Sequence, residues 1–152
     1  MLTIRRVDTT NPDFQQLAQR LTALLAGLNG EADAFYAGHN KLDTIPNGVL
    51  AYLDGLAVGC GAFRVVNATT VEIKRIFVSA EIRRQGIATA LLTKLEEWAQ
   101  ELGFEYAVLE TSRRLTAAIA LYEWFDYARI DKYDPYVGID DSVCFEKSLG
   151  HS

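Results

Sequence analysis

The order of apolar runs and turn residues predicts an α/β protein: a mixed sheet with helices on both faces. In the first half, two strand-like runs flank Asp54-Gly55, a dipeptide typical of a tight β-hairpin. In the second half, a strand, a helix and a further strand follow one another, which indicates a crossover connection. The 152 residues, 49% hydrophobic and 23% charged, suffice for one domain (residues 1–152) with its own core.

The first half is predicted to hold a strand, a long helix and then the hairpin. Alternation over residues 2–6 indicates the strand, and Asn11-Pro12-Asp13 starts the helix with a capping side chain, a first-turn proline and an acid. Apolar residues follow at helical spacing: Phe14, Leu17, Leu21, Leu24 and Leu28. Asn29-Gly30 ends this helix. A short helix is expected within residues 31–40, and the hairpin strands over 49–53 and 56–66.

The second half is predicted to begin with a strand over residues 70–78. A helix from Gly86 to Gly103, which is placed as a C-cap glycine, is expected to bury one apolar face. That face comprises Ile87, Leu91, Leu95, Trp98 and Leu102. A strand over 106–111, a helix over 116–125 and strands over 129–133 and 143–147 complete the expected fold.

Composition excludes several classes of function. The net charge of -5 and the pI of about 5.0 argue against a nucleic-acid-binding face, which is usually basic. Cys60 and Cys144 lie in apolar runs and are expected to be buried thiols of a cytoplasmic protein. Neither the cysteines nor the two histidines form a metal-ligand pattern, so no metal is expected. The N-terminus lacks a signal-peptide pattern, and no apolar run has membrane-spanning length.

Residues 72–89 carry the strongest functional signal. A strand ends there in a charged turn that opens directly into a helix. The first N–H groups of a helix and its positive dipole end suit phosphate, Gly86 leaves room for a ligand, and Arg83 and Arg84 add positive charge. The turn is interpreted either as a pyrophosphate site or as a solvated turn with two surface arginines.

Residues 72–125 resemble the GNAT superfamily, the acetyl-CoA-dependent N-acetyltransferases, and the resemblance extends over nearly the whole chain. The family loop Gln/Arg-x-x-Gly-x-Gly/Ala is matched by residues 83–88, RRQGIA, after a strand of type E-x-K-R-x-F-V. Residues 118–122, AIALY, match the family segment A-x-x-L-Y, and the final SVCFEKSL resembles the last strand of small bacterial members. The resemblance implies a mostly antiparallel sheet of six to seven strands, splayed between its two central strands.

The same resemblance implies an acetyl-CoA site without metal. The pantetheine arm would lie in the splay and bind backbone groups of Ile76, Phe77 and Val78 as a substitute strand. Main-chain N–H groups of the following loop would hold the pyrophosphate. The loop residues are Arg83, Arg84, Gln85, Gly86, Ile87, Ala88 and Thr89. Leu115 departs from the family, because many relatives have an asparagine there that contacts the CoA arm.

Two residues match positions that carry proton chemistry in the family. Glu72 is interpreted either as the base or water relay for the amine, or as a structural carboxylate paired with a neighbouring cation. Simple alternation would place Glu72, Lys74, Ile76 and Val78 on one face of the strand. Tyr122 matches the tyrosine that protonates the leaving thiolate, and its alternative is a core tyrosine.

The acceptor site is expected between the first helix–loop region and the loop before the last strand. This placement nominates Phe35, Tyr36, His39, Asn40, Tyr133, Tyr136 and Asp141. Aromatic rings with an acid would hold a cationic amine; otherwise the rings pack a sheet edge or a homodimer interface. Arg113 and Arg114 either meet CoA phosphates or the acceptor, or are solvated.

The sequence therefore predicts a cytoplasmic N-acetyltransferase whose partners are acetyl-CoA and an amine acceptor. Direct attack in a ternary complex is expected, with a small molecule as the first choice of acceptor. Two alternatives stay open: a protein lysine or N-terminal acetyltransferase, and a catalytically silent acyl-CoA sensor or interaction module.

Overall fold

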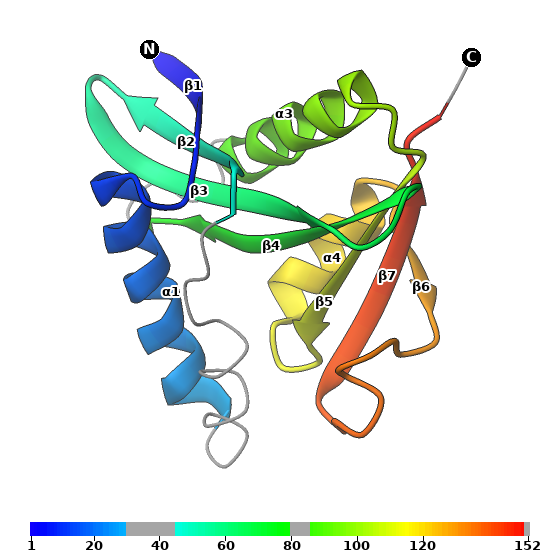
Figure 1. Ribbon diagram of the computed structural model, residues 1–152. Coiled ribbons are helices and arrows are strands. Elements are labelled where there is room, and N and C mark those ends of the chain that lie inside the picture. The colour runs from blue at the N-terminus through cyan, green and yellow to red at the C-terminus, as the bar shows by residue number, and fades with distance from the viewer. Residues whose placement is uncertain (30–44, 80–85, 151–152) are drawn as a thin grey trace.

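A computed structural model describes residues 1–29, 45–79 and 86–150, and shows a seven-stranded sheet between helices (Figure 1). The strands are β1 (Leu2–Val7), β2 (Asn47–Leu53), β3 (Leu56–Val65), β4 (Thr70–Val78), β5 (Tyr106–Ser112), β6 (Ala128–Ile130) and β7 (Ser142–Ser148). The helices are α1 (Pro12–Asn29), α3 (Ile87–Glu101) and α4 (Thr116–Trp124). The predicted α/β class is confirmed, whereas the short helix expected within residues 31–40 lies outside the described residues.

The strand order is β1-β2-β3-β4-β5-β7-β6, and every neighbouring pair is antiparallel except β4 and β5. The predicted hairpin is confirmed at Asp54-Gly55, where Leu53 pairs with Leu56. Asp54 and Gly55 have φ of 51° and 84°, and positive φ at both central residues is typical of a type I′ turn.

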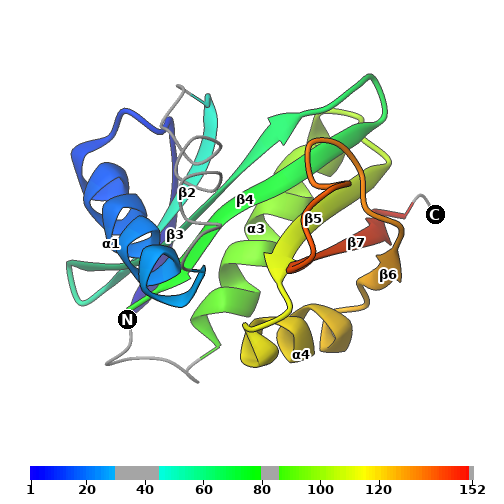
Figure 2. The same ribbon diagram turned by 90° about the horizontal axis from the view of Figure 1, so that it is seen from below.

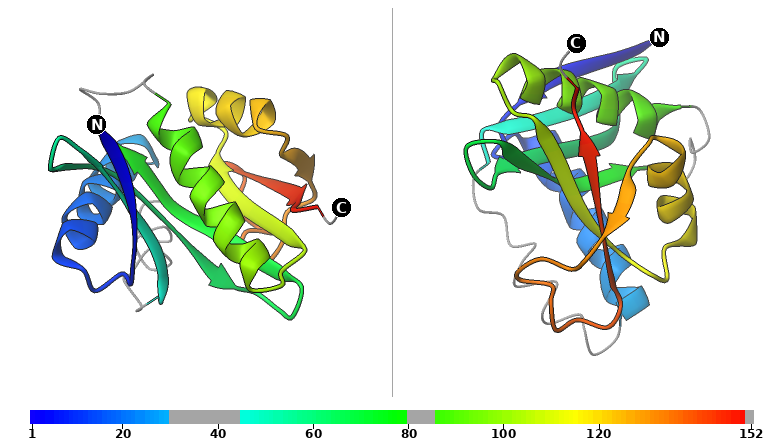
Figure 3. Two further views of the ribbon diagram at one scale, coloured as in Figure 1. Left: turned by 90° about the horizontal axis from the view of Figure 1, so that it is seen from above. Right: turned by 90° about the vertical axis from the view of Figure 1, so that its right-hand side faces the viewer.

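Two apolar clusters fasten the helices to opposite faces of the sheet. α1 buries Phe14, Leu17 and Ala18 against β2, β3 and β4, including Leu50 and Phe77. On the other face, α3 and α4 both cover the sheet (Figure 3) and share one cluster. Its members include Leu91, Leu92 and Leu95 of α3, Tyr122 of α4 and Phe145 of β7. Each fully buried side chain of this size contributes about 1.5–3 kcal/mol.

The helix predictions hold in outline and fail in detail. Asn11 caps α1 as predicted, since its Oδ1 accepts from the Asp13 N–H at 2.9 Å. Leu102, expected on the buried face of α3, is 54% exposed because it lies past the last helical residue. Within the described ranges, none of the helices is both long and apolar enough to cross a bilayer.

The sheet opens between β4 and β5, as the resemblance implied. The two strands pair from Thr70↔Tyr106 to Ile73↔Leu109, and the register ends there although both strands continue. Figure 2 shows the two arrowheads diverging beyond that point. A gap between two central strands therefore lies at their C-terminal ends.

A β-bulge in β4 changes which side chains face which helix. Between the pairs Cys60↔Phe77 and Ala62↔Lys74, Gly61 of β3 lies opposite both Arg75 and Ile76. Arg75 has φ of 61°, and a Cβ at Gly61 would lie 2.5 Å from Ile76 Cδ1. Glycine at this position therefore leaves the space that Ile76 fills.

The bulge makes the simple alternation predicted for β4 wrong. Ile76 and Val78 pack with Ile73 in the cluster beneath α3, whereas Phe77 belongs to the cluster beneath α1. The extra residue shifts the period of two by one position. Glu72 and Lys74 consequently do not share a face with Ile76 and Val78.

Candidate functional site

Two cavities meet where β4 and β5 separate. The larger, about 620 Å³, lies between the end of β4, the start of α3 and the N-terminal part of α4. The smaller, about 120 Å³, lies between the facing parts of β4 and β5. Their common wall comprises Leu21, Ile76, Leu115, Ala118 and Tyr122. Molecules bound in the two cavities could therefore meet at this wall.

The larger cavity has the start of a helix in its wall. Gly86, with φ of 75°, precedes α3, and its carbonyl accepts from the Ala90 N–H at 3.0 Å and the Thr89 hydroxyl at 2.9 Å. The first N–H groups of a helix have no intrahelical acceptor, so this end suits an anionic group. Opposite α3, the cavity is bounded by the part of β4 that lies beyond its pairing with β5.

Most of the residues predicted to bind acetyl-CoA come together in this cavity. They are Ile76, Phe77 and Val78 from β4, and Gly86, Ile87, Ala88 and Thr89 at the start of α3. Arg83, Arg84 and Gln85 lie outside the described residues. Of the predicted loop, the structure therefore describes Gly86 and the first turn of α3.

Glu72 lies at the wall of the smaller cavity and is 1% exposed. Its Oε1 accepts from Arg64 Nε at 2.6 Å and lies 3.9 Å from Lys74 Nζ, while its Oε2 accepts from the Tyr133 hydroxyl at 2.7 Å. Both carboxylate oxygens are thus engaged. These contacts agree with the structural interpretation of Glu72. To act as a base, Glu72 would have to release one of these hydrogen bonds or receive the proton through another group.

Charged residues that the sequence analysis did not nominate for the site also lie at the smaller cavity. Lys74 and Arg75 of β4 and Glu110 of β5 line it. Burial lowers the pKa of the Lys74 ammonium, and the Glu72 carboxylate opposes that shift. Glu110 Oε2 accepts from the Ser142 hydroxyl at 2.6 Å. The parallel pairing of β4 with β5 was the signal that would have found Glu110, because it follows Leu109, the last paired residue.

Tyr122 of α4 lines both cavities and is 8% exposed. Its ring packs against those of Tyr127 and Phe145, with centroids 6.0 and 6.2 Å away. Burial raises the pKa of its phenol, and the nearby Glu110 carboxylate raises it further. The hydroxyl therefore stays protonated and can donate a hydrogen bond to a molecule bound in the cavity. The ring also packs in the core, as the alternative interpretation of Tyr122 as a core tyrosine expected.

Tyr133, Tyr136 and Asp141 are the acceptor-site candidates that the structure describes, whereas Phe35, Tyr36, His39 and Asn40 lie outside the described residues. Tyr136 is buried at the smaller cavity, and its ring meets that of Tyr133 edge-on at 5.5 Å. Burial raises the pKa of both phenols, with Glu72 adding to the effect. Tyr136, from the loop between β6 and β7, lines the smaller cavity, and Tyr133 packs against it.

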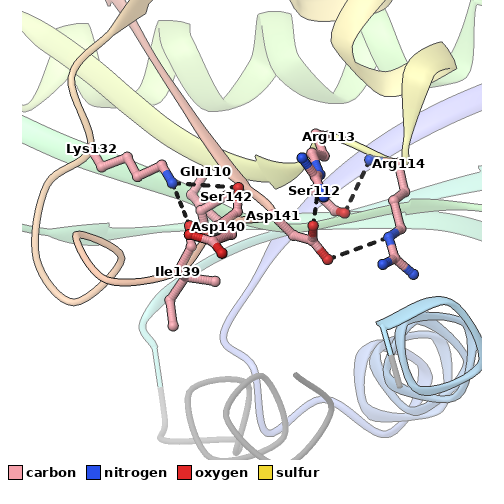
Figure 4. Close-up of polar contacts among 9 residues, drawn as sticks. All are labelled: Glu110, Ser112, Arg113, Arg114, Lys132, Ile139, Asp140, Asp141 and Ser142. Carbon is pink, nitrogen blue, oxygen red and sulfur yellow. Dashed lines mark hydrogen bonds and ion pairs between the residues drawn. The ribbon is translucent and has the colours of Figure 1, made fainter. Parts of the chain in front are cut away.

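Ionic contacts fasten the loop that carries these tyrosines (Figure 4). Asp141 accepts from Arg113 Nε at 2.7 Å and pairs with Arg114 Nε at 3.3 Å. Lys132 Nζ donates to the carbonyl of Ile139 at 2.5 Å. Arg113 and Arg114 are partly solvated, as the interpretation of solvated arginines expected, and both also form ion pairs with Asp141. Arg114 lines the larger cavity as well.

Leu115 stands at the N-cap of α4 and makes no side-chain cap, so the departure from the family pattern leaves an apolar group in the common wall. Cys60 and Cys144 are buried, as predicted, and burial raises the pKa of the Cys60 thiol to about 12. Among residues 1–29, 45–79 and 86–150, no group of three potential metal ligands is found.

Known proteins are similar to this chain in sequence and in structure. The acetyltransferase (GNAT) family model matches residues 13–127. The IAA acetyltransferase of Azospirillum brasilense is 32% identical over 102 residues, which is 66% of this chain and 67% of that protein. YsnE, an uncharacterized N-acetyltransferase of Bacillus subtilis, is 32% identical over 93 residues, 60% of this chain and 62% of that protein.

Other curated relatives match over less of their own length. An uncharacterized N-acetyltransferase from Dictyostelium discoideum is 39% identical over 62 residues, 41% of this chain and only 29% of that protein. Except for the Azospirillum enzyme, the matched segments cover less than two thirds of these relatives.

Solved structures cover the chain more fully. A crystal structure described as an acyl-CoA N-acyltransferase, from Klebsiella pneumoniae, has a TM-score of 0.84 and 29% identity and covers 99% of each chain. A GNAT family acetyltransferase from Elizabethkingia anophelis with acetyl-CoA bound has a TM-score of 0.71 at 20% identity, covering 97% of each chain. The second likeness supports the fold alone.

Proposed function

Because this chain belongs to the acetyltransferase (GNAT) family, we propose that it transfers the acetyl group of acetyl-CoA to a primary amine of a small molecule. The observation that carries this proposal is the common wall of the two cavities at Ile76 and Tyr122. A donor in the larger cavity and an acceptor in the smaller would meet there in a ternary complex, and no covalent enzyme intermediate is required. We place this activity in the cytoplasm.

The larger cavity fits the donor. Its β4 wall, Ile76–Val78, offers extended backbone to an amide-bearing arm, and Gly86–Thr89 offer helix N–H groups to a pyrophosphate. Arg83, Arg84 and Gln85 belong to the same proposed loop. Acetyl-CoA supplies the acetyl group as an activated thioester.

Tyr122 is the proposed acid. The neutral amine attacks the carbonyl carbon, the new C–N bond forms, and the C–S bond breaks as Tyr122 gives its proton to sulfur. A backbone N–H near Val78 would stabilise the oxyanion that develops meanwhile. The products are the amide and the free thiol of CoA.

Glu72 is the proposed acceptor of the amine proton, directly or through water. Since Arg64 and Tyr133 occupy its oxygens, either contact must lengthen, or a relay must connect Glu72 to the amine. Proton transfer back to Tyr122 phenolate then resets the site.

The limited size of the smaller cavity, about 120 Å³, favours a small acceptor over a protein amine. A lysine side chain or an N-terminus of a protein remains the second candidate, because a single side chain would also fit. The alternative from another class is an acyl-CoA sensor that binds without turnover.

Release of CoA from acetyl-CoA, followed across a panel of amines and peptides, tests the proposal. Amine-dependent thiol release, with the acetylated amine identified by mass, is the expected result. Binding of acetyl-CoA without turnover for any amine would instead identify a sensor, and turnover confined to peptides would identify a protein acetyltransferase.

A further inference from the structure

Lys74 lies in the wall of the smaller cavity with no anion closer than 3.9 Å in the described part of the chain. Its side chain is 12% exposed, and its one ion pair in the described part of the chain is with Glu72, at 3.9 Å. The same Glu72 oxygen already accepts from Arg64 at 2.6 Å, and the other accepts from Tyr133. A buried cation is costly without a close anion, so an anionic group in this cavity would stabilise the Lys74 ammonium.

Glu110 brings the opposite charge to the facing strand. Lys74 follows Ile73 and Glu110 follows Leu109, and Ile73↔Leu109 is the last pair of the parallel register. The two side chains therefore come from the first residues beyond the point at which the strands part, one from each strand. Both line the smaller cavity.

Glu110 lies within electrostatic reach of both Tyr122 and Lys74. Its charge raises the pKa of the Tyr122 phenol and opposes the lowering of the Lys74 pKa. Glu110 and Tyr122 both line the smaller cavity, so an ammonium group attracted to Glu110 would lie in a cavity that Tyr122 also lines. A negative group on the same molecule would find Lys74 on the other strand.

We propose that the acceptor is an amine that also carries a carboxylate, with Lys74 binding the carboxylate and Glu110 receiving the ammonium before it loses its proton. This inference rests on the proposed function and specifies its acceptor. Polyamines and simple alkylamines would lack the group that Lys74 binds.

Matched acceptors test the inference. An amino acid, its carboxamide and the amine that lacks the carboxyl carbon differ only in the group that meets Lys74. We expect the amino acid to have the highest kcat/KM, and Lys74→Met to remove that preference by raising KM about 30-fold or more. The affinity for acetyl-CoA should not change. Lys74→Arg, which keeps the charge, should retain part of the preference.

Lys94→Met is the matched control, because Lys94 is an exposed residue of α3 that pairs with Glu97 at 3.5 Å. It removes the same charge from the surface and should leave the preference intact. Glu110→Gln should raise KM for amino acid and carboxamide alike, since both present the amine.

Two results overturn the inference, and they are distinguishable. Equal kcat/KM for the amino acid and its carboxamide, or an equal loss of both in Lys74→Met, would show that Lys74 does not recognise a carboxylate while the transferase activity stands. Binding of acetyl-CoA with no CoA release for any amine would overturn the proposed function itself, and this inference with it.

Discussion

Tyr122 is the residue of α4 that lines both cavities and carries a polar group, its hydroxyl. Its ring is held among Tyr127 and Phe145, so its position is fixed by packing. Burial keeps the phenol protonated, which is the state a proton donor needs.

Tyr122→Phe should lower kcat by about 10²- to 10⁴-fold, nearer the lower value because a thiolate is already a fair leaving group. The ring and its packing are kept, so acetyl-CoA affinity should change little. Steady-state kinetics and a binding isotherm measure the two effects.

Tyr127→Phe is the matched control. Tyr127 is also buried, donates to Glu96 at 2.8 Å and lines neither cavity. It should lose stability and keep kcat. Unchanged kcat in a folded Tyr122→Phe protein, with chemistry limiting the rate, would exclude the acid role.

Glu72→Gln separates the two interpretations of Glu72. If the carboxylate accepts the amine proton, the variant should be slow at every pH, and the acidic limb of the wild-type pH–rate profile should be absent from its profile. Loss of the charged partner of Arg64 and Tyr133 should also cost about 1.5–3 kcal/mol of unfolding free energy for each hydrogen bond weakened.

A pH–rate profile and a denaturant titration on the same preparations make the comparison. Reduced stability together with the wild-type rate and profile would assign Glu72 a purely structural role.

Among the secondary-structure elements, α3 begins at the wall of the larger cavity, where its first N–H groups are proposed to bind the pyrophosphate. Gly86→Glu should abolish acetyl-CoA binding, because a side chain and a negative charge would stand where the pyrophosphate is proposed. Wild-type protein at a ligand concentration 100 times Kd should gain about 2.7 kcal/mol, seen as a rise in Tm that the variant lacks.

Gly103→Glu is the control for backbone strain, since Gly103 has φ of 92° just beyond the other end of α3. It should lower the Tm of the free protein and preserve the shift caused by acetyl-CoA. A folded Gly86→Glu protein with wild-type affinity would refute the assignment of this loop.

The elements that could be predicted are those with short-range causes. The Asn11 cap, the Asp54-Gly55 turn and Gly86 act on neighbours within a few residues, so their sequence patterns are sufficient. The bulge at Gly61 depends on a count of residues across two strands, and neither strand alone reveals it.

The residues of the candidate site also fall into those with short-range causes and those brought together by the register of the sheet. The proposed acetyl-CoA loop is a contiguous motif, so the sequence pattern alone could nominate its residues, and those that the structure describes, Gly86–Thr89, line the larger cavity. Tyr133 reaches Glu72 from 61 residues away, and Glu110 joins the site because β4 and β5 pair in parallel. Such contacts follow from the register of the sheet, which the sequence pattern left open.

For the whole molecule, buried phenols link stability to alkaline pH. Burial raises the pKa of Tyr122, Tyr127, Tyr133 and Tyr136 above the value of about 10 that tyrosine has when unfolded. Above about pH 10 the folded state keeps protons that the unfolded state releases, so the free energy of unfolding falls as the pH rises.

These four phenols should therefore ionise together with unfolding. Phenolate absorbance and near-ultraviolet circular dichroism, followed in one alkaline titration, should show coincident transitions for this part of the absorbance. Complete tyrosine ionisation near pH 10 with the dichroism retained would contradict the burial of these rings.

The bulge divides β4 into two segments that line different cavities. Glu72 and Lys74, before it, line the smaller cavity only, whereas Phe77 and Val78, after it, line the larger cavity only. Substitutions in the two segments touch different cavities, so their effects on binding should be close to additive. Under the proposed function, substitutions before the bulge should change the preference among amines while the affinity for acetyl-CoA stays the same.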